Sequence, residues 1–304
     1  MLRRLWQYQK ERFPLVAHGS MVIVFCVSVM LFAALQGGEF PGLIRVLAAS
    51  VSTLIMFFLL RVADEFKDFE IDSNYRPHRA VPRGLVSLRE LGWLAGSGAV
   101  LQFLIALTID VGLLPILIIV WAYIALMTHE FFVGEWLVRT PSAYLLSHML
   151  VMPLIAFYVL AFDWLPGGNR LPDGLAWLLL LSFGAGLVLE IGRKVKAPET
   201  ERDGVETYSA LWGAGKALAV WGAACALATG AFAGAVSFVD GSGALISVVI
   251  GMTIAVLAVG IIGTASVSLA KSTRWIEPVS GVIAMLLYVA VGPLHVLLGS
   301  TGIN

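Results

Sequence analysis

The sequence is poor in charged residues, in cysteine and in net charge, and each shortage excludes a class of protein. Charged residues make up 13% of the 304, whereas soluble domains have about 25%. The two cysteines, Cys26 and Cys225, lie in separate apolar runs, which excludes a disulfide framework and a cysteine-rich metal site. The 20 Lys and Arg residues balance the 20 Asp and Glu residues, so we expect no nucleic-acid partner.

Apolar residues are abundant instead, at 59% of the chain, and the mean hydropathy is +0.89. Such continuous apolar runs do not alternate as the strands of a barrel do, and each is near the roughly 20 residues that a membrane-spanning helix needs. We predict an all-α polytopic membrane protein, one integral membrane domain over residues 1–304. The predicted spans are roughly 16–36, 43–63, 90–109, 112–131, 143–163, 173–191, 216–238, 244–269 and 278–299.

The distribution of Lys and Arg predicts the orientation of these nine helices. If the N-terminus is cytoplasmic, 18 of the 20 basic residues lie on the cytoplasmic side, and only Arg45 and Arg170 lie on the other. The first apolar run is long enough to span and lacks a small-x-small cleavage site, so we expect no cleavable signal peptide. We therefore expect an integral protein of a bacterial inner membrane, with a cytoplasmic N-terminus and cytoplasmic functional loops at 64–89 and 190–215.

The first functional loop begins with a dense acidic cluster directly after the second predicted helix. The stretch "DEFKDFEID" (64–72) holds five acidic residues. If the helix continues through it, Asp64, Asp68 and Asp72 are spaced i, i+4, i+8 and share one face. Three like charges on one face repel each other unless a cation binds. Carboxylates together with substrate phosphates are the usual ligands of Mg²⁺, so we predict a Mg²⁺ site here.

Basic residues follow the acids in the stretch "SNYRPHRAVPRG" (73–84). The planar donor fork of arginine matches phosphate oxygens, so Arg76 and Arg79 are candidate phosphate ligands. The alternative is a solvated loop held together by surface ion pairs. The acids that share a face, and a second charged cluster about 130 residues further on, favour the functional interpretation.

That second cluster, "EIGRKVKAPETERDGVETYSALWG" (190–213), follows the sixth predicted helix. Pro198 suits the first turn of a helix, in which Glu199 and Asp203 are spaced i, i+4. The basic residues around them include Arg193, Lys194 and Lys196. The two loops at matching places indicate two four-helix halves plus a ninth helix. Two acidic helix faces with basic neighbours fit a diphosphate bridged by Mg²⁺, and so favour an enzyme that ionises a lipid diphosphate.

Three further ionisable residues, His129, Glu130 and Glu135, lie at the cytoplasmic end of the fourth predicted helix. Ionisable groups at membrane depth are candidates for function. We expect one of them, with Glu130 foremost, to take a proton from an acceptor or to quench a carbocation. The alternative is that they are solvated at the headgroup level or paired with Arg139.

These motifs resemble the UbiA superfamily of intramembrane prenyltransferases over essentially the whole chain. That family shows N-D-x-x-D-x-x-x-D after its second helix, then R-P-x-P-x-G, and D-x-x-x-D after its sixth. Here "DEFKDFEID" keeps the first spacing, with Asp64 in place of Asn and Glu65 in place of Asp, and "RAVPRG" (79–84) matches the second element. Glu199 and Asp203 keep the third spacing. Of the basic stretch after the fourth helix, "VRTP" (138–141) carries over only Arg139, Thr140 and Pro141.

The resemblance implies Mg²⁺-dependent ionisation of a prenyl diphosphate and transfer of the prenyl group to an acceptor that the sequence does not identify. Taking the residues and the resemblance together, we predict as catalytic residues Asp68, Asp72, Glu130 and Arg139. The implied metal ligands are Asp64, Asp68, Asp72, Glu199 and Asp203. The predicted diphosphate ligands are Arg76, Arg79, Arg139, Arg193, Lys194 and Lys196. Two alternatives stay open: a terpene cyclase of the same superfamily, in which an internal alkene traps the cation, and a cation transporter.

Overall fold

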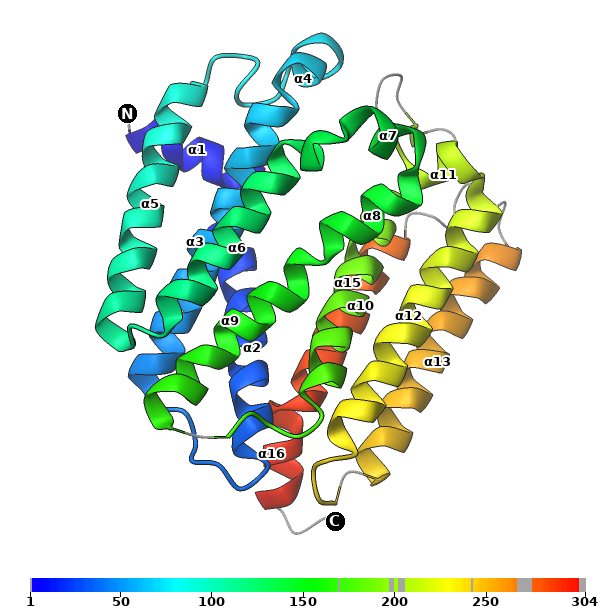
Figure 1. The fold of residues 1–304 in the computed structure, drawn as a ribbon. Coiled ribbons are helices and arrows are strands. Elements are labelled where there is room, and N and C mark those ends of the chain that lie inside the picture. The colour runs from blue at the N-terminus through cyan, green and yellow to red at the C-terminus, as the bar shows by residue number, and fades with distance from the viewer. Residues whose placement is uncertain are drawn as a thin grey trace. The chain divides into compact units, whose positions relative to one another are not determined.

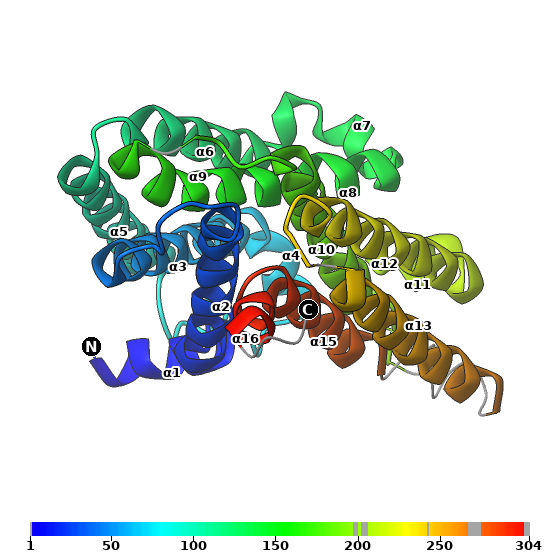
Figure 2. The same ribbon diagram turned by 90° about the horizontal axis from the view of Figure 1, so that it is seen from below.

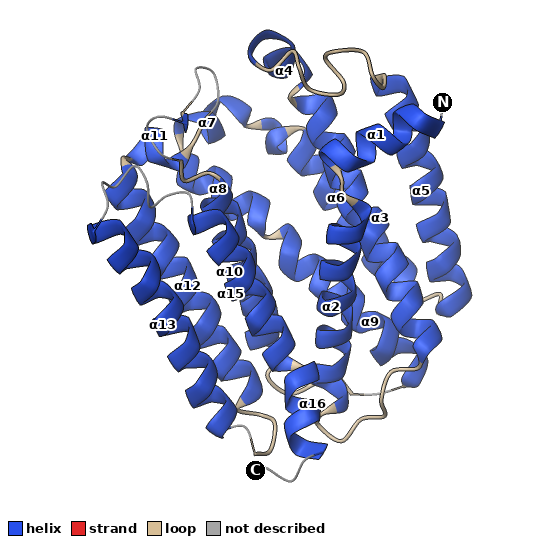
Figure 3. Ribbon diagram, turned by 180° about the vertical axis from the view of Figure 1, so that it is seen from behind, coloured by secondary structure: helices blue, strands red, loops and turns tan. Residues whose placement is uncertain are grey.

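A computed structural model describes residues 2–168, 170–196, 200–201, 206–241, 243–266 and 275–300. This part of the chain forms helices and loops and contains no strand (Figure 3). The helices are α1 Leu2–Arg12, α2 Leu15–Ala34, α3 Leu43–Lys67, α4 Phe69–Tyr75, α5 Leu88–Ile109, α6 Leu113–Thr128, η1 Glu130–Phe132, α7 Gly134–Arg139, α8 Pro141–Met149, α9 Val151–Gly167, α10 Leu175–Arg193, α11 Tyr208–Trp212, α12 Ala214–Val236, α13 Gly243–Ser266, α15 Ile276–Val291 and α16 Pro293–Ser300 (Figure 1).

The predicted membrane spans correspond to these helices. In the described part of the chain, six spans are long and apolar enough to cross a bilayer, formed by α2, α3, α5, α8 with α9, α10, and α12. Shorter apolar helices lie at the other three predicted positions, over Leu113–Thr128, Leu245–Ile254 and Ile276–Val291. The prediction of an all-α polytopic fold is confirmed, and nine is an approximate number of spans.

The chain forms two compact units that alternate along the sequence. The first contains residues 1–26, 41–141 and 158–169, and the second contains residues 27–40, 142–157 and 170–304. A buried polar network ties the helices of the first unit together. Gln102 Nε2 on α5 donates to the Ser52 carbonyl on α3 at 2.8 Å, Trp121 Nε1 on α6 donates to Gln102 Oε1 at 3.0 Å, and the Ser52 and Tyr158 hydroxyls lie 2.8 Å apart. Such hydrogen bonds help to hold membrane helices together, because the hydrophobic effect does not drive helices to associate inside a bilayer.

Small residues let the helices of the second unit approach closely. A Cβ added at Gly184 on α10 would lie 2.9 Å from the Ala228 Cα atom on α12, so only glycine fits there. The helices α12 and α13 run side by side in both views (Figures 1 and 2). A Cβ added at Gly292, which separates α15 from α16, would lie 2.8 Å from the Cα atom of Ser28. The packing of this unit therefore depends on glycine and alanine at the helix contacts.

Candidate functional site

The first acidic cluster lies where α3 ends, and the helix does not run through it unbroken. The uninterrupted helix that we expected to carry Asp64, Asp68 and Asp72 ends at Lys67, and α4 begins at Phe69. Asp68 forms the junction, with φ −89° and ψ 3°. The Asp68 N–H still donates to the Asp64 carbonyl at 2.9 Å and the Asp72 N–H to the Asp68 carbonyl at 2.8 Å. The three acids therefore stay one turn apart, although the helix bends between them.

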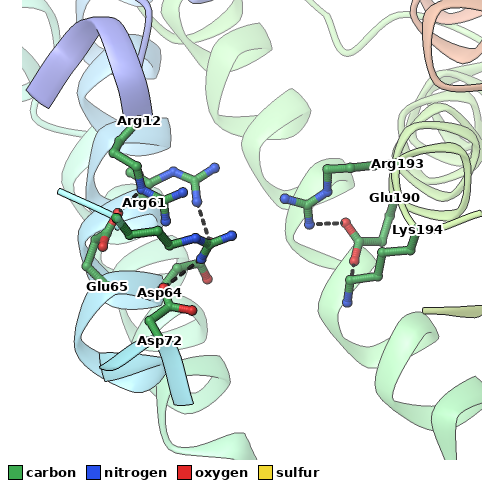
Figure 4. Close-up of polar contacts among 9 residues, drawn as sticks. Arg12, Arg61, Asp64, Glu65, Asp72, Glu190, Arg193 and Lys194 are labelled. Carbon is green, nitrogen blue, oxygen red and sulfur yellow. Dashed lines mark hydrogen bonds and ion pairs between the residues drawn. The ribbon is translucent and has the colours of Figure 1, made fainter. Parts of the chain in front are cut away.

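Arginines neutralise the two buried acids of this cluster. Glu65 Oε1 accepts a hydrogen bond from Arg12 Nε of α1 at 2.6 Å (Figure 4). Asp72 Oδ2 accepts one from Arg79 at 2.6 Å, and Arg76 Nε lies 2.9 Å from Asp72 Oδ1. Burial lowers the pKa of Arg79, while the hydrogen bond to Asp72 opposes that shift. Buried charges need such partners, because an unpaired charge is costly to remove from water.

The remaining acids of the motif are more accessible. Asp64 is 54% exposed and lies 3.4 Å from an Arg61 nitrogen. Asp68 is partly exposed and makes no ion pair within the described part of the chain. Glu70 is exposed on α4. Among Asp64, Asp68 and Asp72, the described acids predicted to bind metal, Asp68 is therefore the one whose carboxylate needs no rearrangement to accept a cation.

A small hydrophobic core holds the arginine loop in place. Ala80, Val81 and Val86 of the loop pack with Tyr8 of α1 and with Leu91 of α5, and all five side chains are buried. Burial, and next to it the charge of Glu65, raises the pKa of Tyr8, so its hydroxyl stays protonated. The loop that carries Arg76 and Arg79 is thus anchored on both sides by apolar contacts, which keeps the two guanidinium groups near Asp72.

The predicted catalytic residue Glu130 contacts the end of α3. Its carboxylate lies 2.8 Å from Lys67 Nζ. Glu130, Phe131 and Phe132 have φ values of 50°, 53° and 59°, a left-handed turn that is costly for residues other than glycine. His129 stacks on Phe132. The other predicted residue of this region, Arg139, is exposed on α7 and lies 4.0 Å from Glu135. The structure thus places Glu130 beside the first acidic motif and leaves Arg139 on the surface.

The basic cluster of the second unit is organised by an acid that we did not predict. Glu190 at the end of α10 lies 2.6 Å from Arg193 and 3.0 Å from Lys194 (Figure 4). Lys194 Nζ also lies 5.7 Å and 5.6 Å from the ring centres of Tyr144 and Tyr208. Burial, and then the Glu190 carboxylate, raises the pKa of Tyr208. Lys194 is therefore held by a carboxylate and two aromatic faces.

The rest of the second motif is only partly described. Lys196 Nζ pairs with Glu277 at 2.8 Å. Glu201 accepts hydrogen bonds from the hydroxyls of Thr207 and Ser209, at 2.7 Å and 2.6 Å. The predicted metal ligands Glu199 and Asp203 lie outside the described residues. Their role, and the predicted pairing of the two clusters around one diphosphate, stay predictions.

The donor set of the first motif fits a hard divalent cation in its chemistry. Within the described residues, no three acidic, histidine or cysteine side chains converge tightly enough to hold a metal by themselves. Asp72 Oδ1 is nevertheless buried without a hydrogen bond of good geometry, although Arg76 is close to it. Asp68 carries an unpaired carboxylate one turn away. Mg²⁺ commonly completes its shell with water and substrate phosphate, so two protein carboxylates suffice.

Comparison with solved structures gives the fold a name. A UbiA homologue from Aeropyrum pernix K1 without ligand superposes with a TM-score of 0.66 at 18% identity, over 89% of this chain and 96% of that chain. A digeranylgeranylglyceryl phosphate synthase gives 0.61 at 18% identity, over 95% and 99%. A UbiA homologue from Archaeoglobus fulgidus bound to GPP and Mg²⁺ gives 0.57 at 13% identity, over 93% and 99%.

The chain has the UbiA fold. No protein-family model and no curated protein sequence matches it, so the likeness lies in the arrangement of the helices and extends over nearly the whole chain. The resemblance that the motifs indicated is confirmed at the level of the fold.

Four charged residues of this UbiA fold were missed by sequence reasoning: Arg12, Arg61, Lys67 and Glu190. Two of them had a local signal, because Arg61 with Asp64 and Glu190 with Lys194 stand at helical i, i+3 and i, i+4 spacings. Arg12 and its partner Glu65 are 53 residues apart. Only the three-dimensional packing of α1 shows that this pair exists.

Proposed function

We propose that this chain is a Mg²⁺-dependent intramembrane prenyltransferase, which ionises a prenyl diphosphate and passes the prenyl group to an acceptor. The observation that carries the proposal is the buried Asp72 with its two arginines, on the short helix α4 that follows the apolar helix α3, in a chain with the UbiA fold. Two structures of the Archaeoglobus fulgidus homologue, bound to GPP and Mg²⁺ and to DMAPP and Mg²⁺, support it.

Arg76 and Arg79 supply preorganised positive charge for a diphosphate. They are partly buried, and both now contact one carboxylate. A diphosphate that enters this site offers more oxygens and more negative charge than Asp72, so the guanidinium groups can shift to it with little movement. Charge-assisted hydrogen bonds of this kind are roughly twice as strong as neutral ones. The predicted ligands Arg193, Lys194 and Lys196 of the second unit belong to the same proposal.

Asp64, Asp68 and Asp72 would hold the metal in the first unit, with Glu199 and Asp203 as the predicted ligands of the second. Bound Mg²⁺ would neutralise the diphosphate and improve it as a leaving group. Asp68 would accept the cation directly, because no described side chain competes for it. Asp72 would be free to act as a second ligand if Arg76 and Arg79 contacted the diphosphate in its place.

The reaction breaks the allylic C–O bond, and the electron pair leaves with the diphosphate. The acceptor attacks the resulting allylic cation and must lose a proton. Glu130 is the proposed proton acceptor, since its carboxylate pairs with Lys67 and so lies beside the first motif. Arg139 on α7 is the proposed additional diphosphate contact.

The test uses the purified full chain in lipid nanodiscs with a panel of prenyl diphosphates. We expect Mg²⁺-dependent release of pyrophosphate, measured by a coupled assay, and its loss on chelation. Asp68→Ala should reduce the rate by more than the roughly 10–100-fold that loss of an outer-shell partner costs. Glu70→Ala is the matched control, because this exposed acid lies two residues away, and its rate should stay within about twofold. Manganese titration followed by electron paramagnetic resonance measures metal binding independently of turnover.

Each outcome assigns a function. An acceptor requirement supports transfer, whereas a cyclic hydrocarbon or alcohol from the diphosphate alone would make the chain a terpene cyclase. Cation flux in liposomes without any reaction would indicate a transporter. Wild-type activity and metal binding in Asp68→Ala would overturn the assignment of the first motif.

A further inference from the structure

Helix α1 uses one face to hold the first unit together. At about 100° per residue, Arg4, Leu5, Tyr8 and Arg12 fall on one side of the helix. Arg4 pairs with Glu90 of α5 at 2.9 Å, Tyr8 and Leu5 pack in the small core beneath the arginine loop, and Arg12 pairs with Glu65 of α3. Half of the positive charge of α1 is therefore directed into the unit.

The opposite face of α1 is exposed and combines apolar with cationic residues. Leu2 and Trp6 are 84% and 56% exposed, one turn apart. Arg3 and Lys10 lie on the same side, and in the described part of the chain neither has an acidic partner. Lys10 Nζ lies 5.4 Å from the centre of the Trp6 ring. Aromatic and leucine side chains beside Lys or Arg are typical of helices that lie in the interface of a bilayer.

The placement of α1 within the first unit agrees with this composition. It lies across the ends of α3 and α5 instead of parallel to them (Figures 1 and 3). Both of those helices are candidate membrane spans. Only two residues separate α1 from α2, whose first turn exposes Leu15 and, at 87%, Val16. Exposed apolar side chains of a candidate membrane span thus follow α1 after a gap of two residues.

We propose that the outward face of α1, formed by Leu2, Arg3, Trp6 and Lys10, binds the anionic headgroup layer of the bilayer. The two apolar side chains enter the boundary of the acyl region, and the two cations contact lipid phosphates. A basic residue near an anionic surface contributes about 1 kcal/mol, which is about a fivefold change in affinity for each charge. The proposal concerns α1 alone and does not depend on the prenyltransferase assignment.

A protein partner fits this face less well than a lipid surface does. A stable protein interface needs about 800 Å² and 20–30 residues on each side, whereas the outward face of an 11-residue helix offers four side chains. Its unpaired charges are both positive, which complements the anionic lipids of a bilayer. A second copy of the chain would bring two positive faces together.

The first experiment measures the depth of α1 with a spin label. A cysteine at position 6 (Trp6→Cys) can be labelled selectively, because Cys26 and Cys225 are buried. In bilayers of phosphatidylcholine with phosphatidylglycerol, the label should collide more with oxygen than with a water-soluble nickel complex. A label on exposed Asn74 of α4 gives the comparison value. A label at position 6 that collides mainly with the nickel complex would overturn the proposal.

The second experiment tests the charge. The measured quantity is the affinity of the protein for spin-labelled phosphatidylglycerol relative to phosphatidylcholine. For the lipids that contact α1, this ratio should fall about fivefold for each charge removed, in Arg3→Gln and in Lys10→Gln. The matched variants Arg3→Lys and Lys10→Arg keep the charge and should keep the preference. An unchanged preference in the double Gln variant would contradict the proposal. A dimer in detergent that Trp6→Gln dissociates would assign the face to a second copy instead.

Discussion

The buried ion pair between Arg12 and Glu65 allows a quantitative test of how α1 supports the first motif. The two side chains are only 15% and 1% exposed, and their hydrogen bond is 2.6 Å long. Replacing Arg12 with Met keeps most of the apolar stem but leaves a buried carboxylate without its cation. Removal of one partner from a buried pair typically costs about 3–5 kcal/mol.

The double variant distinguishes this explanation from a general loss of packing. When Glu65 is also replaced with Met, no charge is buried, and such replacements are often neutral or stabilising. We therefore expect Arg12→Met to lower the unfolding temperature by roughly 6–20 °C, and Arg12→Met with Glu65→Met to recover most of that loss. Arg3→Met on the exposed side of the same helix should change it little, because exposed charges contribute about 0–1 kcal/mol.

The two buried cysteines provide the assay. Cys26 belongs to the first unit and Cys225 to the second. In a Cys225→Ala background, a maleimide dye that reacts with Cys26 on heating reports the unfolding of the first unit in detergent. The reasoning would be refuted by an Arg12→Met loss below about 1 kcal/mol, or by losses that simply add in the double variant.

Two other predictions use the same assay. Gln102→Leu removes the acceptor of Trp121 and the donor to the Ser52 carbonyl. Cys26 should therefore react at a lower temperature, by an amount that corresponds to about 1–3 kcal/mol. An unchanged temperature would show that the network contributes nothing to the stability of the first unit. Glu190→Gln leaves Lys194 without its carboxylate, so in a Cys26→Ala background Cys225 should react at a lower temperature. The loss of stability should be about 1–2 kcal/mol, because Arg193, the other partner of Glu190, is half exposed. A loss as large as that of Arg12→Met would contradict this reasoning.

The apolar runs predicted the fold well because a bilayer imposes a length on every helix that crosses it. The predicted spans 16–36 and 43–63 correspond to α2 and α3, with ends that differ by a few residues. The fifth and ninth spans are each broken in two, at Leu150 and at Gly292. Gly292 is close to the backbone of Ser28. Hydropathy does not reveal such tertiary contacts.

The site was predictable where its signal is local. The spacing of Asp64, Asp68 and Asp72 survives as main-chain turns, because i, i+4 geometry is a property of the helix itself. The break at Asp68 was not predictable, since no Gly or Pro lies between residues 64 and 72. It precedes the turn in which Asp72 contacts Arg79, a contact that depends on how the loop folds back.

The ion pair that joins α1 to α3 also constrains how such a chain can diverge. Loss of the positive charge at position 12 leaves a buried acid without a partner at position 65. Neutral residues at both positions are therefore tolerated more readily than a neutral residue at one of them. Among relatives with this fold, we therefore expect the residue types at these two positions to covary across 53 intervening positions, with either an arginine and an acid or two neutral side chains.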